Sequence, residues 1–252
     1  PQIPSDGSEI TVQGVGLGGL RSPGSQLDLG NSGTGARLLL GVLSGSAVET
    51  TMTGDESLRS RPMCRVTEPL RAMGARFDFL AEDGLLPIRL RGKRPLQEID
   101  WSTPVASAQV KSSILLAGLT GGASALITEP EQSRDHTERI FRQVGVSTES
   151  RAVADGWRVE MHNPPNRISE LDFRVPGDVS SAAFLLASAV LGGTAASLDI
   201  VGVGLNPTRT AFLEVLERMG AEITVETDAD DENLEARGTV SASLSSLTGT
   251  HV

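Results

Sequence analysis

Cysteine, aromatic residues and basic residues are all scarce in this chain of 252 residues. One cysteine, Cys64, excludes an internal disulfide and a zinc site with several cysteine ligands, and it fits a reducing cytoplasm. Aromatic residues make up 3% and tyrosine is absent, so the stacking rings that bind single-stranded nucleic acid are missing. A net charge of -10 also opposes contact with phosphate backbones. We therefore expect no nucleic-acid partner.

Long apolar runs are missing as well. No stretch reaches the roughly 18 residues that cross a membrane, and no signal peptide is visible, so we expect a cytoplasmic protein without a membrane partner. The acidic run from Glu222 to Glu235 does not match a calcium loop, which predicts a solvated hairpin or loop. The chain starts at Pro1 without Met and stops at Val252 in polar sequence, so both ends look cut.

Three segments repeat one pattern, a Ser- or Gly-rich start followed by an Ala/Leu-rich helix and a Gly. They are residues 30–45, 107–122 and 178–193. Each precedes an expected strand, at 50–53, 125–128 and 197–201, and then a second, amphipathic helix. The unit recurs about every 70 residues, and alternating strands and helices of this length predict an α/β protein. The third Ala/Leu-rich helix is apolar around so much of its circumference that we expect it to be buried.

The glycine-rich stretch 14–19 is not a dinucleotide-binding fingerprint, because Pro23 and Gly24 follow where the helix would begin. The segment 30–37 is the stronger ligand candidate. Its small residues let backbone N–H groups at a helix start approach an anion, and Arg37 adds a positive charge. Asn31, Ser32 and Thr34 cap this helix or add donors. A capped helix with a surface arginine is the alternative interpretation.

Two arginines form the second candidate element. Arg59 and Arg61 come just before Pro62, which suits the first turn of a helix, and an arginine fork matches a carboxylate or phosphate. In the alternative interpretation, Asp55 and Glu56 merely pair with these arginines on the surface.

Two further helix starts carry polar residues. Ser107 is a candidate cap, and Gln109 offers a donor and an acceptor to a hydroxylated ligand. Arg134 and His136 add anion-binding capacity beside Ser133, although helix-start chemistry also explains that segment. Scattered histidines and one cysteine predict no transition-metal site. Several donor-rich helix starts with arginines, in an acidic protein, predict a pocket for small anions.

Six motifs, in order along the chain, resemble the 5-enolpyruvylshikimate-3-phosphate synthase family. They are GNSGTGARLLL, GDESLRSRPM, SAQVKSSILLAGL, SRDHTERIF, PGDVSSAAFLLA and GLNPTRTAFLEVLERMGA, and the likeness to bacterial members covers essentially the whole chain. The resemblance implies a two-domain enolpyruvyl transferase fold, an inside-out α/β barrel of repeated βαβαββ units, incomplete here at both ends. Residues 1–174 would form most of the first domain and residues 175–252 the start of the second.

The resemblance also implies an activity. The family transfers the enolpyruvyl (carboxyvinyl) group of phosphoenolpyruvate to the 5-hydroxyl of shikimate 3-phosphate and releases phosphate, in the cytoplasmic pathway to chorismate and the aromatic amino acids. It uses no metal and no organic cofactor, is inhibited by glyphosate, and we expect a monomer when intact. The expected phosphoenolpyruvate ligands are Asn31, Gly33, Thr34, Arg61 and Gln109. The expected shikimate 3-phosphate ligands are Ser107, Ala108 (through its backbone), Gln109, Ser133 and Arg134.

The family's general-base Asp and its Lys-Glu segment would lie beyond Val252. We therefore assign no catalytic residue within this chain and predict no turnover from it alone. One alternative is a truncated, non-catalytic anion-binding relic, and another is one domain of a multifunctional polypeptide. A third is the enolpyruvyl transferase that acts on UDP-N-acetylglucosamine, which typically has a Cys before its Arg-Pro pair, whereas Cys64 follows Arg61 and Pro62.

Overall fold

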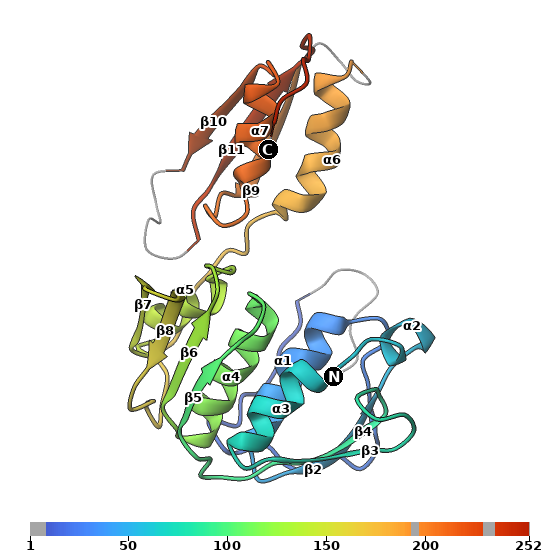
Figure 1. Ribbon diagram of the computed structural model, residues 1–252, viewed down its shortest axis with the longest axis vertical. Helices are drawn as coiled ribbons and strands as arrows, with labels where there is room; N and C mark the ends of the chain where they lie inside the picture. The colour runs from blue at the N-terminus through green and yellow to red at the C-terminus, as the bar shows by residue number, and fades with distance from the viewer. Residues whose placement is uncertain (1–8, 193–196, 229–234, 252) are drawn as a thin grey trace. The chain divides into compact units, whose positions relative to one another are not determined.

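In the computed structural model, residues 9–192, 197–228 and 235–251 are described, and the chain divides into two compact units (Figure 1). The first unit consists of Pro1–Pro130 with Ser147–Ile168, and the second of Glu131–Val146 with Ser169–Val252. Helix α5 (His136–Gln143) is grouped with the second unit, although the strands on either side of it in the sequence belong to the first. The domain boundary expected after residue 174 stays a prediction.

The first two repeats follow the same path. Repeat one contains β1 (Leu27–Asp28), α1 (Gly33–Ser44), β2 (Glu49–Thr53), α2 (Glu56–Arg59), α3 (Cys64–Ala72), β3 (Arg76–Phe79) and β4 (Ile88–Arg91). Repeat two contains β5 (Ile99–Ser102), α4 (Ala108–Gly121), β6 (Ala125–Glu129), α5, β7 (Thr148–Val153) and β8 (Gly156–Met161). The sheets are ordered β1-β2-β4-β3 and β5-β6-β8-β7, and in each the first pair is parallel and the rest antiparallel. The expected βαβαββ unit is thus present twice, with α2 as an extra turn.

The third repeat keeps the same order in the second unit. It contains α6 (Val179–Val190), β9 (Ser197–Gly204), α7 (Ala211–Arg218), β10 (Ile223–Thr227) and β11 (Arg237–Ser243), in a sheet ordered β10-β11-β9. Gly177 forms a single parallel bridge to Val203 of β9, in the place that β1 and β5 hold in the other sheets. The strands expected at 50–53, 125–128 and 197–201 lie within β2, β6 and β9, as predicted.

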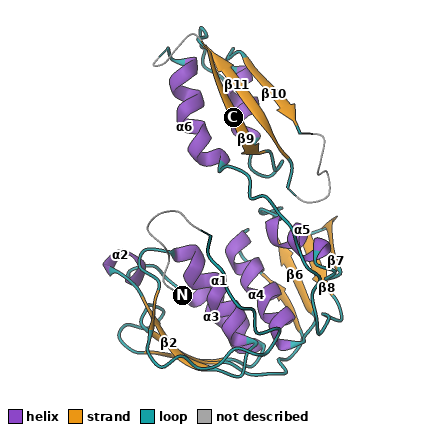
Figure 2. Cartoon of the chain, turned by 180° about the vertical axis from the view of Figure 1, so that it is seen from behind, coloured by secondary structure: helices purple, strands orange, loops and turns teal. Residues whose placement is uncertain are grey.

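In the first unit, helices α1, α3 and α4 pack on one another and the two sheets lie outside them (Figures 1 and 2). Helices α1 and α4 pack very closely because glycines face the contact. A Cβ built on Gly41 would lie 2.3 Å from the backbone oxygen of Ser113, and one on Gly45 would lie 2.2 Å from Thr120 Oγ1. Glycine is therefore required at Gly41 in α1 and at Gly45, the C-cap of α1.

The expectation that the third Ala/Leu-rich helix is buried all round is wrong. Helix α6 buries one face, including Leu186 and Val190, against β9 and β11. Phe184 and Leu185 on the other side are 81% and 52% exposed. The reason is that, among the described residues, one sheet covers α6, whereas α4 is covered by two helices and a sheet.

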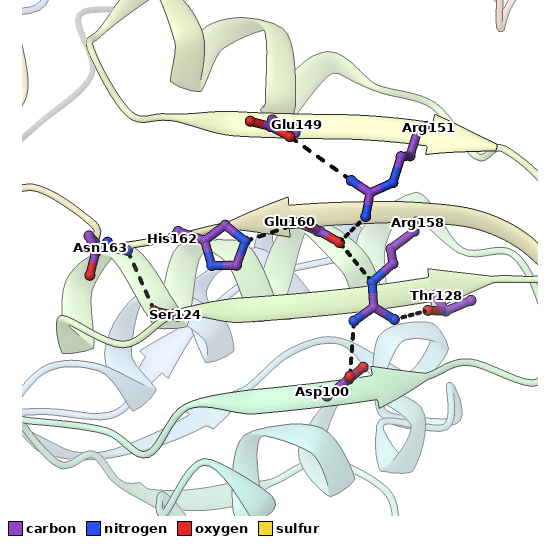
Figure 3. A network of polar contacts seen from close by, with 9 residues as sticks. All are labelled: Asp100, Ser124, Thr128, Glu149, Arg151, Arg158, Glu160, His162 and Asn163. Atoms are coloured by element: carbon purple, nitrogen blue, oxygen red, sulfur yellow. Dashed lines mark hydrogen bonds and ion pairs between the residues drawn. The ribbon is translucent and has the colours of Figure 1, made fainter. Parts of the chain in front are cut away.

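The sheet of the second repeat exposes a network of charges on its outer face (Figure 3). Arg158 donates to Asp100 at 2.9 Å and to Glu160 at 2.9 Å, and Arg151 donates to Glu160 at 2.7 Å. The Arg151 hydrogen bond, then those of His162 and Arg158, lower the pKa of Glu160 to about 2. Inward-facing Val159 and Met161 alternate with these charges along β8, so the network lies on the face of the sheet opposite its core and joins neighbouring strands.

Predictions for the glycine-rich stretch, for Pro62 and for the acidic run can also be compared with the structure. Residues 14–19 form a turn, with Gly19 N donating to Gly16 O at 3.2 Å. Pro62 does not enter a helix, because α3 begins two residues later and has Met63 at its N-cap. The acidic run contributes β10, which pairs with β11 in the predicted hairpin, while residues 229–234 lie outside the described residues. Glu235 is not solvated as expected: it is 7% exposed and pairs with His136.

Candidate active site

The starts of α1 and α4 lie side by side in the first unit. Gln109 Nε2, in the first turn of α4, donates to Thr34 Oγ1 in the first turn of α1 at 2.7 Å. Further along, Thr120 Oγ1 donates to Val42 O at 3.1 Å. Residue numbers rise together in both helices, so the helices are parallel and their positive dipole ends meet at one place. Such an arrangement favours an anion.

Two guanidinium groups extend over this place. Arg61 Nη2 donates to Asn31 Oδ1 at 2.5 Å, and Arg37 Nη1 donates to Gln109 Oε1 at 2.7 Å. A Cβ on Gly33 would lie 2.9 Å from Arg61 Nη1 and 3.3 Å from Arg37 Nη1. Gly33 therefore lets both arginines approach the helix start closely. The structure brings together Asn31, Gly33, Thr34, Arg61 and Gln109, the five residues predicted to contact one anion.

The site is electrostatically positive. The pKa of Arg37 is lowered by burial and then by the charges of Arg65 and Arg61. A guanidinium keeps its proton even so, which means that three positive charges lie within mutual influence. Sequence reasoning missed Arg65, which lies in the first turn of α3, four residues after Arg61.

Asp55 orients one of the donors instead of pairing with an arginine. It caps α2 by accepting from Leu58 N at 2.7 Å, and its other oxygen accepts from Asn31 Nδ2 at 2.8 Å. The backbone bond from Leu58 and then the Asn31 amide lower the pKa of Asp55. With its nitrogen held by Asp55, Asn31 turns its oxygen towards Arg61. The alternative interpretation of a plain surface ion pair is therefore wrong for Asp55.

The helix-start predictions have mixed outcomes. Ser32 caps α1 by accepting from Gly35 N at 3.0 Å, as one interpretation had it. Ser107 occupies the N-cap position of α4, but its side chain makes no cap hydrogen bond, so that prediction is wrong. Ala108 is the first residue of α4, beside Gln109. Ser133 and Arg134 belong to the second unit, before α5, and their role as ligands of the same substrate stays a prediction.

A second polar cluster lies within the second unit. Asn206 Nδ2 donates to Asp135 Oδ1 at 2.7 Å and to Glu235 Oε2 at 3.1 Å. His136 Nδ1 lies 2.5 Å from Glu235 Oε1, so this nitrogen faces a carboxylate rather than an anionic ligand. His136, Asn206 and Glu235 line a cavity of about 290 Å³ together with apolar residues such as Ile140.

No group of three potential metal-ligating side chains occurs in the part of the chain that the structure describes. Within the same residues, no helix is long and apolar enough to cross a membrane. The first unit gathers helix starts, amides and guanidinium groups at one place. The fold and this arrangement together define an α/β repeat protein with a site that favours small anions.

Comparison with known proteins gives the family. The pattern of the family described as EPSP synthase (3-phosphoshikimate 1-carboxyvinyltransferase) matches residues 2–246. The chain therefore belongs to the EPSP synthase family, and the predicted fold class is confirmed.

Relatives and solved structures agree. A relative from Geobacillus thermodenitrificans named 3-phosphoshikimate 1-carboxyvinyltransferase is 46% identical over 97% of this chain and 55% of its own length. One from Methylococcus capsulatus with the same name is 48% identical over 88% of this chain and 49% of its length. The structure of EPSP synthase from Acinetobacter baumannii matches with a TM-score of 0.80 and 40% identity over 95% of this chain and 52% of that one. The chain thus spans about half the length of these relatives.

Proposed function

We propose that the protein containing this chain transfers the enolpyruvyl group of phosphoenolpyruvate to the 5-hydroxyl of shikimate 3-phosphate and releases phosphate. Family membership and the names of the relatives support this reaction. The observation that carries it is the meeting of the α1 and α4 starts under the guanidinium groups of Arg37 and Arg61. Phosphoenolpyruvate has a carboxylate and a phosphate, which such a site fits.

The residues around Gly33 would bind phosphoenolpyruvate. Arg61 offers parallel N–H groups to one of its anionic groups, while Asn31 and Thr34 add polar contacts at the helix start. The absent side chain of Gly33 leaves room beside both arginines. Gln109 contacts Thr34 and Arg37 and so lies where a second substrate would meet the first.

Shikimate 3-phosphate would lie against Ser107, Ala108 and Gln109, with Ser133 and Arg134 at its phosphate. Its 5-hydroxyl gives up its proton to a base and the oxygen adds to C2 of phosphoenolpyruvate, while the methylene carbon takes up a proton from an acid and becomes a methyl group; the product is a tetrahedral intermediate. Loss of a proton from that methyl group and cleavage of the bond between C2 and the phosphate oxygen then restore the double bond and release phosphate. The negative charge that develops on the departing phosphate is stabilised by the two helix starts and the arginines, which are already in position.

The test is a phosphate-release assay on the complete reading frame that contains these residues, with both substrates. Arg61→Lys should lower kcat/KM about 30- to 1000-fold, since a lost bidentate contact is worth roughly 2–4 kcal/mol. The matched control is Arg59→Lys, an exposed arginine two residues away, which should stay within about threefold of the parent. Phosphate release that does not depend on shikimate 3-phosphate would contradict the proposal, and equal kcat/KM in both variants would remove Arg61 from the site.

A further inference from the structure

The start of α4 is held in a different way from the start of α1. Ser107 has the extended backbone of an N-cap, with φ -150° and ψ 102°, yet its hydroxyl bonds none of the helix N–H groups. Ser32, at the same place in α1, accepts from Gly35 N at 3.0 Å. The two repeats therefore use equivalent serines differently, and the Ser107 hydroxyl is not required by the helix.

The backbone amide of Ser107 is held by a buried carboxylate, that of Glu129. Glu129 Oε1 accepts a hydrogen bond from Ser107 N at 2.8 Å, and Glu129 Oε2 lies 3.2 Å from Lys111 Nζ. Both charged side chains are 0% exposed. Glu129 ends β6, which pairs with β5 on one side and β8 on the other, so its backbone is held in the middle of a sheet.

Stability alone is a poor reason for this pair. Removing two charges from water costs several kcal/mol per ion, and apolar replacements of a buried pair are often neutral or stabilising. The pair instead fixes the first turn of α4. Glu129 bonds the amide of Ser107 at the N-cap and also pairs with Lys111, one helical turn further on. The first turn carries Gln109, which is bonded to Thr34 and Arg37.

We propose that the buried Lys111–Glu129 pair positions the ligand-binding turn of α4, with Glu129 anchoring the Ser107 amide so that the Ser107 hydroxyl is left for the hydroxylated, phosphorylated substrate. Glu129 and Lys111 do not touch the substrate. They are positioning residues, and they act through Ser107. The inference rests on the proposed function, because it takes shikimate 3-phosphate as the ligand of this turn.

The experiment compares two double variants in the complete reading frame. Lys111→Met with Glu129→Gln removes both charges but keeps an oxygen that can accept from the Ser107 amide. Lys111→Met with Glu129→Met removes both charges and the acceptor as well. Neither variant leaves an unpaired buried charge, which would otherwise be strongly destabilising. The readouts are the KM for each substrate, kcat, and the urea midpoint.

We expect the Gln-containing variant to keep the parent's KM for shikimate 3-phosphate within about threefold, and the Met-containing variant to raise it about tenfold, the effect of one lost buried hydrogen bond. The KM for phosphoenolpyruvate should change less than threefold in both. Equal KM values for shikimate 3-phosphate in the two variants, whether raised or not, would overturn the inference. A parent without activity on shikimate 3-phosphate would instead overturn the proposed function, and this inference with it.

Two single variants keep the inference testable if the double variants do not fold. Ser107→Ala should raise the KM for shikimate 3-phosphate while leaving the urea midpoint unchanged, because its hydroxyl caps nothing. Ser32→Ala is the matched control and should lower the urea midpoint, because this hydroxyl caps α1. Equal losses of stability in the two variants would show that Ser107 serves the helix, and would overturn the inference.

Discussion

Replacing Gly41 with alanine tests the packing that brings the two helix starts together. The added Cβ would lie 2.3 Å from Ser113 O and 2.8 Å from Ser113 Cα, both backbone atoms that no rotamer change can move. The α1–α4 distance would have to increase by roughly 1 Å to restore ordinary contact. That shift would also strain the bond from Ser113 Oγ to Arg37 O, which spans the helices at 2.7 Å.

The expected magnitude follows from three terms. Overpacking costs about 1–3 kcal/mol and the weakened interhelical hydrogen bond about 1 kcal/mol. The better helix propensity of alanine offsets about 1 kcal/mol. The net loss of unfolding free energy is therefore about 1–3 kcal/mol, or roughly 1 M in the urea midpoint.

Tryptophan fluorescence is the assay. The chain has two tryptophans, Trp101 in β5 and Trp157 in β8, and both report on the first unit. Gly24→Ala is the control, since a Cβ there meets nothing within 4 Å. If Gly41→Ala and Gly24→Ala unfold at the same urea concentration, the close packing of α1 on α4 is refuted as the reason for glycine at Gly41.

Three further predictions concern other parts of the molecule. Gly33→Ala places a methyl group 2.9 Å from Arg61 Nη1, so the guanidinium group must shift. We expect the glyphosate inhibition constant of the intact protein to rise about tenfold or more, and an unchanged constant would count against this prediction. Because the folded-state pKa of Glu160 is lowered to about 2, its stabilisation is complete above the unfolded pKa near 4.5 and is lost as the pH falls towards 2. The urea midpoints of the parent and Glu160→Gln should therefore differ at pH 6 and converge near pH 2, and a constant difference would contradict the assignment. Asn206→Asp adds a third carboxylate beside Asp135 and Glu235 and should lower the thermal midpoint measured by circular dichroism. The control, Asn163→Asp, changes an exposed residue and should leave the midpoint unchanged. Equal midpoints in the two variants would refute the role of the Asn206 amide as a donor to both carboxylates.

Much of the fold could be predicted from the sequence, because the residues that begin and end a helix are its immediate neighbours in the chain. A glycine follows the second helix of each repeat at the repeat spacing, and Gly74, Gly145 and Gly220 all have a positive φ, which favours glycine at a helix end. The cluster at Asn31 and Gly33 was predictable for the same reason, since a few consecutive residues determine where a helix starts and which donors it presents.

Two of the failures depend on distant partners. Nothing near Ser107 shows that Glu129, 22 residues further on, holds its amide and makes a cap unnecessary. The burial of Glu235 depends on His136, which is 99 residues away. Pairs of this kind are set by sheet order, and a single sequence carries no local signal for them.

The distribution of acids among the helix starts supports the same site. An acid in the first turn normally stabilises a helix, and α2, α5 and α7 each have a glutamate there. Helices α1, α3 and α4, which are packed together in the first unit, have none. Helix α6 also lacks one but has Asp178 as its cap, and the Ser180 N–H keeps the pKa of that carboxyl low. The first turns of α1 and α4 thus carry no acidic side chain of their own, as expected at a site whose ligand brings negative charge.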